Sequence, residues 1–229
     1  MLQTACRKIR WAGISFLCLP VIFSCFTFIV YAQKPDSAGR EIYKNITIGK
    51  QVWMTDNLTI GLFRNGDSIL EARTAEEWIQ AGKAGKSAWC YYENKIENGV
   101  KYGKLYNWYA INDLRGLAPA GWHIPTDEEW RQTTLFLGGE DAAGTKMKNS
   151  AGWTRDGNGT NESGFSGLPA GSRSRFGEFS NIGHIAYWWC STNYDADFAW
   201  YRVIDESPYY VYRTNYYKQN GYSVRCIPD

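Results

Sequence analysis

Few residues of this chain could carry out acid–base or nucleophilic chemistry. The only imidazole bases for a serine or cysteine nucleophile are His123 and His184. His123 stands between two large apolar residues before a predicted helix, and His184 stands in a predicted loop, so we interpret both as packed histidines that bond the backbone. The motifs Gly-x-Ser-x-Gly and His-Glu-x-x-His and the phosphate-binding glycine loop are absent from the sequence. The sequence therefore favours a protein without catalytic residues.

One loop has the side chains of a cation site. Oxygen-bearing side chains alternate at Asp156, Asn158, Thr160 and Glu162, as a loop that folds around a hard cation requires. The loop lacks the sixth-position glycine and the twelfth-position glutamate of an EF-hand. Clusters of Asn, Asp and Gly also form turns through local hydrogen bonds. Calcium is the one cofactor that the sequence suggests, with turn formation as the alternative.

Aromatic residues crowd the last third of the chain, where exposed rings are candidate ligand-binding groups. Trp188 and Trp189 are neighbours on a predicted strand, so a regular strand points one of them away from the core. Tyr209, Tyr210 and Tyr212, together with Tyr216 and Tyr217, form the patch that we expect to be exposed. For most of the rings in this region we expect packing in the core.

Helices and strands must position these groups, and the patterns place helices early and strands late. Thr126 and Glu129 have the spacing of a capping box, so a helix should begin at Asp127 and end at Leu137, before two glycines. The other predicted helices are 74–81 and 102–114, and the predicted strands are 41–48, 51–54, 165–168, 185–190, 199–204, 209–213 and 222–227. This order predicts an α+β fold with helices beside an antiparallel sheet.

The N-terminal region predicts export. Three basic residues precede an uncharged run from Trp11 to Val30, and small residues follow at the position of a signal-peptidase site. We expect residues 1–32 to be a signal peptide, with a retained membrane anchor or a lipid on Cys25 as alternatives. Residues 33–40 read as a linker and residues 41–229 as one domain. Membrane contact is expected only through the N-terminal segment, if it is uncleaved.

The charge of the chain argues against nucleic acid as a partner. Residues 1–32 carry three of the 25 basic residues and none of the 23 acidic ones, so the remainder has a net charge of −1. A near-neutral chain without basic clusters gains little from phosphate contacts.

Several motifs, in order along the chain, resemble the Fibrobacter succinogenes major paralogous domain, a bacterial extracellular family. These motifs are 51–54 with 57–58, 102–110, 121–130, 168–171, 188–189 and 223–226. Segments 125–130 and 224–226 also look like parts of formylglycine-generating-enzyme-type domains. The resemblance implies a C-type-lectin-like architecture, in which two main helices flank a small, twisted antiparallel sheet with long loops.

The resemblance also bears on the cysteines and on the function. Cys226 lies in the closing motif, and Cys190 stands where the family usually has serine. In an exported chain we expect a disulfide between Cys90 and Cys226, with Cys190–Cys226 as the rival pairing. The function implied is a noncatalytic binding module of the bacterial surface or secretome, whose ligand is a glycan or another cell-envelope component. The alternatives are an enzyme like the formylglycine-type oxidases and a purely structural envelope protein.

Overall fold

The structure is a computed structural model and describes residues 43–207 and 209–229. The predicted signal peptide and linker lie outside these residues. Within the described residues, no helix is both long enough and apolar enough to cross a membrane.

The two longest helices begin at the predicted capping boxes. In α4 (Asp127–Phe136) the Thr126 hydroxyl accepts a hydrogen bond from the Glu129 amide at 3.2 Å, and the Glu129 carboxylate accepts one from the Thr126 amide at 2.7 Å. Thr74 and Glu77 make the same reciprocal pair at the start of α1 (Ala75–Lys83). The shorter helices are η1 (Tyr92–Asn94), α2 (Ile96–Tyr102), α3 (Trp108–Ile111) and α5 (Ala143–Met147).

Five small sheets hold the described strands. The largest antiparallel sheet has the order β11–β10–β9, formed by β9 (Ala186–Asn193), β10 (Phe198–Ile204) and β11 (Tyr212–Tyr217). The others are β1 (Asn45–Ile48) with β2 (Gln51–Met54), β6 (Trp122–His123) with β12 (Ile227–Pro228), β7 (Ala170–Arg173) with β8 (Phe179–Ile182), and β3 (Leu70–Glu71), β4 (Ala88–Cys90) and β5 (Leu105–Tyr106). Among the named strands of the described residues, only the β3–β4 pairing is parallel. The chain therefore has the predicted α+β class.

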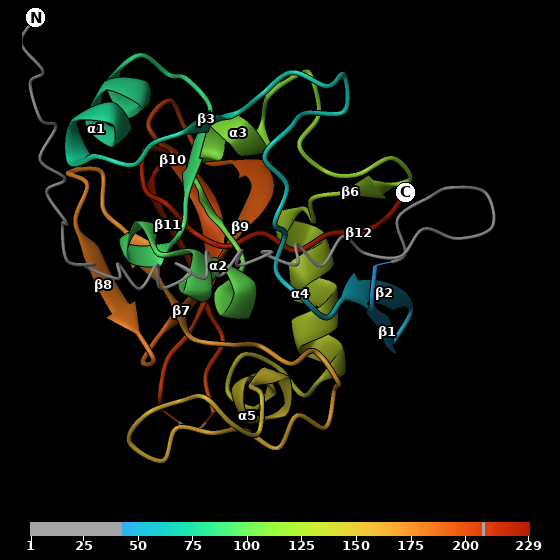
Figure 1. Cartoon of the computed structure of the whole chain (residues 1–229). Coiled ribbons are helices and arrows are strands. Elements are labelled where there is room, and N and C mark those ends of the chain that lie inside the picture. Colours follow the sequence, from blue (N-terminus) through green and yellow to red (C-terminus); the bar gives the residue numbers. More distant parts are fainter. Residues whose placement is uncertain (1–42, 208) are drawn as a thin grey trace, which may run out of the picture.

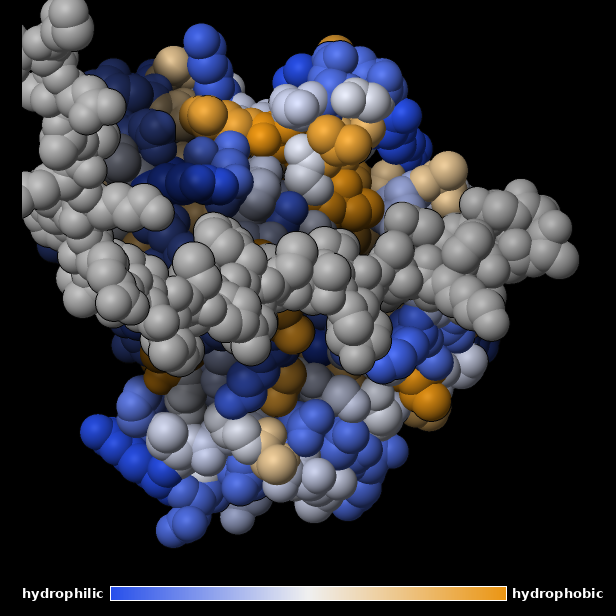
Figure 2. Space-filling model, viewed as in Figure 1, coloured by the Kyte–Doolittle hydropathy of each residue, from blue (hydrophilic) through white to orange (hydrophobic). Residues whose placement is uncertain are grey.

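The helices surround the central sheet (Figure 1). In this view α1 and α3 lie above it, α4 runs beside it, and α5 lies below, while the β1–β2 hairpin is on the far side of α4. On the face seen in Figure 2, apolar side chains gather in the upper half, and polar side chains dominate the lower half.

Strand β9 is buried on both of its faces, which overturns the prediction that one of its two tryptophans is a surface ring. Trp188 and Trp189 are both 0% exposed. Trp188 packs in one hydrophobic cluster with Trp130 and Ile204, and Trp189 packs in another with Tyr201. Alternation along a strand points neighbouring side chains in opposite directions, and here both directions lead into a core.

Several predicted elements are divided or absent. The predicted helix 102–114 is not formed as one element: Tyr102 ends α2, Gly103 has φ +78°, and residues 105–106 belong to β5. A side chain on Gly103 would lie 2.8 Å from Asn57. Asn107 then caps the short α3 by accepting a hydrogen bond from the Ala110 amide. Segment 165–168 forms only an isolated bridge, in which Gly167 pairs with Lys148, and the Gly167 amide donates to the carbonyl of Met147, the last residue of α5. Of segment 222–227, only the last residue belongs to a named strand.

Candidate binding surface

Tyrosine side chains form an exposed surface along the edge strand β11. In the register of the sheet Tyr201 pairs with Thr214 and Val203 with Tyr212, so Tyr212 and Tyr216 lie on the same face of the sheet as Tyr201. Tyr201 is buried in the middle of the sheet, whereas Tyr212 and Tyr216 are 42% and 45% exposed at its edge.

The segment before β11 extends this surface. The Tyr210 ring stacks on the Tyr212 ring, with centroids 5.5 Å apart and planes 23° apart, and Tyr209 is exposed beside them in the sequence. We call Tyr209, Tyr210, Tyr212 and Tyr216 the tyrosine surface. The predicted exposure of Tyr209, Tyr210 and Tyr212 is therefore confirmed, while their ligand binding stays a prediction.

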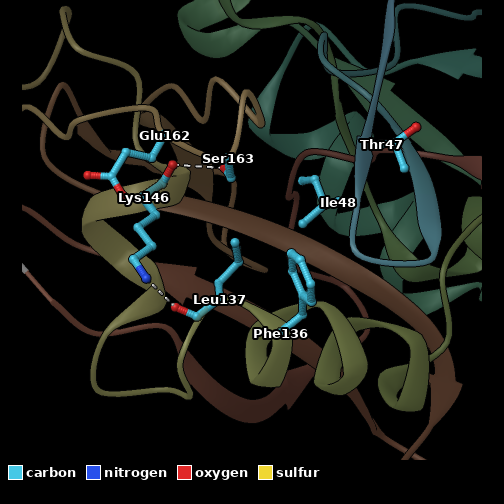
Figure 3. A pocket seen from close by; sticks show the side chains of 7 residues that line it. All are labelled: Thr47, Ile48, Phe136, Leu137, Lys146, Glu162 and Ser163. Carbon is cyan, nitrogen blue, oxygen red and sulfur yellow. Dashed lines mark hydrogen bonds between the residues drawn. The ribbon is translucent and has the colours of Figure 1, made fainter.

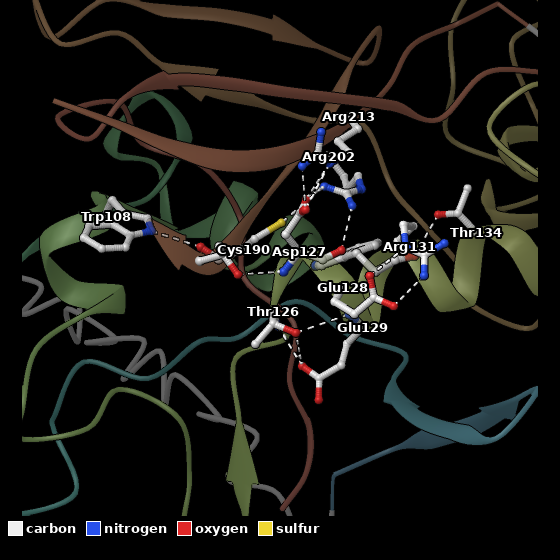
Figure 4. Close-up of polar contacts among 12 residues, drawn as sticks. Trp108, Thr126, Asp127, Glu128, Glu129, Arg131, Thr134, Cys190, Arg202 and Arg213 are labelled. Carbon is white, nitrogen blue, oxygen red and sulfur yellow. Dashed lines mark hydrogen bonds and ion pairs between the residues drawn. The ribbon is translucent and has the colours of Figure 1, made fainter. Parts of the chain in front are cut away.

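An ion-pair network on the opposite face holds β11 in place. Asp127, at the start of α4, lies between Arg202 of β10 and Arg213 of β11 (Figure 4). Its carboxylate accepts hydrogen bonds from Arg202 Nη1 at 2.7 Å and from Arg213 Nη2 at 2.8 Å. Arg213 also covers the Trp200 ring at 3.5 Å. Because Arg213 alternates with Tyr212 along the strand, this network holds β11 from one face and leaves Tyr212 and Tyr216 on the other face.

The network also sets the charge of Asp127. Burial alone raises the pKa of this carboxyl group, but the hydrogen bonds from Arg213 and Arg202 outweigh burial and hold the pKa below its usual value. Asp127 is therefore ionised at neutral pH, and the guanidinium of Arg202, which is 1% exposed, has a partner of opposite charge.

Helix α5 and the preceding loop hold the start of the tyrosine surface. The Gly144 amide donates to the Tyr209 carbonyl at 2.8 Å, and the Val211 amide donates to the Glu140 carbonyl at 2.9 Å. A side chain on Gly144 would lie 2.6 Å from the Tyr209 oxygen, so this approach requires glycine. The buried Lys148 ammonium donates to the Ser207 carbonyl at 2.7 Å. The backbone on the two sides of Tyr209 is therefore hydrogen-bonded to α5 and to its flanking residues.

Three of the motifs that carry the family resemblance, 57–58, 188–189 and 223–226, meet in a buried hydrogen-bond hub. Asn57 Oδ1 accepts from Trp188 Nε1 at 2.8 Å and from Arg225 Nε at 3.0 Å. Arg225 also donates to the carbonyls of Phe165 and Ser166, and its guanidinium lies over the Phe165 ring at 4.0 Å. Burial lowers the pKa of Arg225 to about 9. These motif residues position the core and are closed to a ligand.

Two of the four predicted calcium ligands make hydrogen bonds within the protein. Asn158 Oδ1 accepts a hydrogen bond from the Trp153 amide at 3.0 Å, and the Thr160 hydroxyl donates to the Thr145 carbonyl at 3.4 Å. Asp156 and Glu162 are exposed. Across residues 43–207 and 209–229, no group of three or more His, Cys, Asp or Glu is placed to hold a metal ion. Calcium binding at this loop stays a prediction.

The predicted disulfide is not formed. Cys90, Cys190 and Cys226 are all free and fully buried. Cys90 belongs to the cluster that includes Trp78, whereas Cys226 belongs to the large cluster on the other side of β4 and β5, so the two thiols occupy separate cores. Burial raises the pKa of Cys90 and of Cys190 to about 12. Thiols in this state are poor nucleophiles, because the thiolate is the reactive form.

The histidines bond side chains, and the expectation of backbone partners is wrong. His123 contacts Asp229 through Nδ1 and Glu129 through Nε2, each at 3.1 Å. His184 Nδ1 lies 2.7 Å from the Thr154 hydroxyl and 2.7 Å from the Glu206 carboxylate. Within the described part of the chain, neither imidazole bonds a serine or a cysteine.

A pocket of about 270 Å³ lies between the β1–β2 hairpin and the end of α4. Its lining residues are Thr47, Ile48, Phe136, Leu137, Lys146, Glu162 and Ser163 (Figure 3). Lys146 donates to the Leu137 carbonyl at 2.9 Å, and Ser163 donates to the Lys146 carbonyl at 2.8 Å. The Phe136 ring lies against the turn at Gly49. Because the Lys146 ammonium and the Ser163 hydroxyl already have these hydrogen-bond partners, we consider the tyrosine surface a better candidate for ligand binding than this pocket.

Tyr216 belongs to the expected exposed patch and is exposed, whereas Tyr217 is half-buried, but both lie outside the predicted strands. The predicted strand 209–213 ends before them, whereas β11 runs from Tyr212 to Tyr217. The spacing of Tyr212 and Tyr216, four residues apart, was the available signal, because residues an even number apart share one face of a strand.

Comparison with known proteins identifies the family. Residues 46–228 match the Fibrobacter succinogenes major domain, and the chain therefore belongs to this family. The match includes both the hub around Arg225 and the whole tyrosine surface. No curated protein and no solved structure matches the chain.

Proposed function

We propose that this protein is an exported binding module of the bacterial cell surface or secretome, and that its tyrosine surface binds a glycan of the cell envelope. The observation that carries this proposal is the row of exposed rings Tyr210, Tyr212 and Tyr216 along β11 and the segment before it, where β11 is held by the ion pair between Arg213 and Asp127. Aromatic rings offer a large apolar face at low entropic cost, and a phenol adds a hydrogen-bonding group at the edge. These properties suit the C–H faces and hydroxyl groups of a sugar chain.

The layout of the rings favours an extended ligand. Tyr216 lies four residue steps along the strand from Tyr212, which corresponds to about 13 Å at the usual rise of about 3.3 Å per residue. A single sugar does not reach both rings, whereas an oligosaccharide does. Because Asp127, Gly144 and Lys148 hold this part of the chain by hydrogen bonds, we expect little ordering of the protein to oppose binding.

Export and the C-type-lectin-like architecture are part of the same proposal. Export is supported by the basic and then apolar N-terminal sequence. The architecture is supported by the positions of α1 and α4 on different sides of the small central sheet. The alternative of a formylglycine-type oxidase loses support, because Cys190 and Cys226 are buried, with pKa values raised by burial, and line neither pocket described for this chain.

A glycan array tests the proposal. The full chain is applied once in calcium and once in EDTA, beside Tyr212→Ala and the matched variant Tyr194→Ala, which removes an exposed tyrosine from the β9–β10 turn. We expect binding that survives EDTA, that Tyr212→Ala weakens and that Tyr194→Ala retains. Loss of binding in EDTA would instead point to a metal-built site, and an array without signal would refute a glycan ligand.

A further inference from the structure

A second pocket, of about 340 Å³, lies at α3. Its lining residues are Gly85, Ser87, Trp108, Tyr109, Asn112, Asp113 and Leu114. They come from the loop after α1, from α3 itself and from the segment that follows it. We call this cavity the α3 pocket. Its volume is at the lower end of the range of small-molecule sites, about 300–1,000 Å³.

The charged group of the α3 pocket, the Asp113 carboxylate, is held in place by hydrogen bonds. Asp113 accepts hydrogen bonds from Arg115 Nη2 at 2.8 Å, from Arg115 Nε at 2.9 Å and from the Ser87 hydroxyl at 2.7 Å. The hydrogen bonds from Arg115, supported by that from Ser87, hold the pKa of Asp113 well below its usual range. The pocket therefore presents carboxylate oxygens that are oriented by Arg115, which also pairs with Asp67 at 3.1 Å. Such oriented acceptors suit a ligand with hydroxyl donors.

The rest of the lining offers free polar groups and an aromatic ring. Asn112 is exposed, and its side-chain amide bonds no described residue, while its backbone amide donates to the Trp108 carbonyl. Tyr109 is half-buried, and its phenol likewise bonds no residue of the described chain, while its ring packs beside Gly85. An amide and a phenol can each donate and accept, and the ring supplies an apolar face. Together with Asp113, these groups match the alternating hydroxyls and C–H groups of one sugar residue.

The α3 pocket adjoins the end of the tyrosine surface. The Trp108 amide donates to the Lys218 carbonyl at 2.8 Å, and the Lys218 ammonium lies 4.8 Å from the centroid of the Trp108 ring. Lys218 directly follows β11 and stands two residues beyond Tyr216. Trp108 also packs in the same hydrophobic cluster as Tyr201. Tyr212 and Tyr216 lie on the same face of the sheet as Tyr201. The pocket therefore lies at the C-terminal end of β11, on the side that carries its exposed tyrosines.

We propose that the α3 pocket holds the terminal sugar residue of the glycan whose following residues lie on the tyrosine surface. This inference rests on the function proposed above, because it assigns one end of the same ligand to a second subsite. It also defines the ligand class more narrowly: the glycan is bound by a free chain end, with its terminal sugar in the pocket.

Two sizes of probe separate the subsites. The full chain is titrated with glucose, N-acetylglucosamine and xylose, and with cellotetraose, chitotetraose and xylotetraose, using saturation-transfer NMR and then calorimetry. We expect one of the single sugars to bind weakly, with a Kd of about 1–10 mM. We expect the matching tetrasaccharide to bind more tightly, since it reaches both subsites.

Substitutions in each subsite give the decisive comparison. Tyr109→Ala and Asn112→Ala should abolish single-sugar binding and weaken the tetrasaccharide about tenfold, while Tyr109→Phe keeps the ring and retains most of the affinity. Tyr212→Ala should weaken only the tetrasaccharide. Asn112→Ala alters an exposed side chain, so it distinguishes loss of binding from loss of folding.

The failures of the two proposals are distinguishable. If tetrasaccharide binding depends on Tyr212 and is indifferent to Tyr109 and Asn112, the pocket has no part in binding and this inference is overturned, while the proposed function stands. If single-sugar binding depends on Tyr109 but no tetrasaccharide depends on Tyr212, the tyrosine surface loses its role. If none of the probes binds, both proposals fail.

Discussion

Replacing Arg225 with methionine tests whether the hub is structural. Arg225 is 1% exposed and has no carboxylate in contact among the described residues, so its charge is balanced by the dipoles of Asn57 and of nearby backbone carbonyls. Methionine preserves an unbranched apolar stem but removes every one of these donors. The variant therefore isolates the polar contribution of the hub from its packing.

The expected loss follows from the bonds that disappear. The carbonyls of Met54, Phe165 and Ser166 each lose a donor, whereas Asn57 Oδ1 keeps the one from Trp188. An unsatisfied buried acceptor costs roughly 1–3 kcal/mol, which gives a gross loss of about 3 kcal/mol or more. Removing the guanidinium also relieves its cost of burial, and this cost is visible as the lowered pKa of Arg225. We expect a net loss of about 2–4 kcal/mol in the free energy of unfolding.

Urea denaturation measures this loss. The control is Arg131→Met, because Arg131 is exposed and pairs with the exposed Glu128, a contact worth about 0–1 kcal/mol. Arg225→Met should unfold at a clearly lower urea concentration than the control at a similar m-value. Equal midpoints for Arg225→Met and Arg131→Met would refute the structural role assigned to the hub.

Three further predictions concern the ion pair, a buried lysine and the thiols. Asp127→Ala leaves the Arg202 charge buried and unpaired, so urea denaturation should report a loss of about 3–5 kcal/mol, and a loss below about 1 kcal/mol would contradict the role of this pair. Burial lowers the pKa of Lys104 to about 8, so the folded state holds this proton less tightly than the unfolded state. Stability relative to Lys104→Met should therefore rise as the pH increases from 8 to 10.5, and a flat or falling difference between the two urea midpoints would refute the lowered pKa. Iodoacetamide should modify Cys90, Cys190 and Cys226 only after denaturation, as peptide mass spectrometry can show. Labelling of these cysteines in the native protein would contradict their burial.

The sequence predicted the local features of the fold well. The capping boxes at Thr74 and Thr126 fix where two helices begin, because their partners lie three residues away. The strand 51–54 was likewise predicted with its observed bounds. The predicted helix 102–114 is divided at Gly103, which has φ +78° and lies close to Asn57, a residue distant in sequence.

The binding surface depended more on long-range contacts. The exposure of Tyr209, Tyr210 and Tyr212 could be predicted from local crowding of aromatic residues. The burial of Trp188 and Trp189 could not, because it requires cores on both sides of β9, built by segments far apart in the sequence. The α3 pocket depends on the contact between Ser87 and Asp113, 26 residues apart, which no local pattern indicates.

The most direct test of the central claim is calorimetry of an array-selected glycan with the wild-type chain, Tyr212→Phe and Tyr212→Ala. If the ring binds by stacking, Tyr212→Phe should retain the affinity within about threefold, and Tyr212→Ala should bind about tenfold more weakly. Equal affinities for the wild-type chain and Tyr212→Ala would contradict the assignment of the tyrosine surface as the binding site.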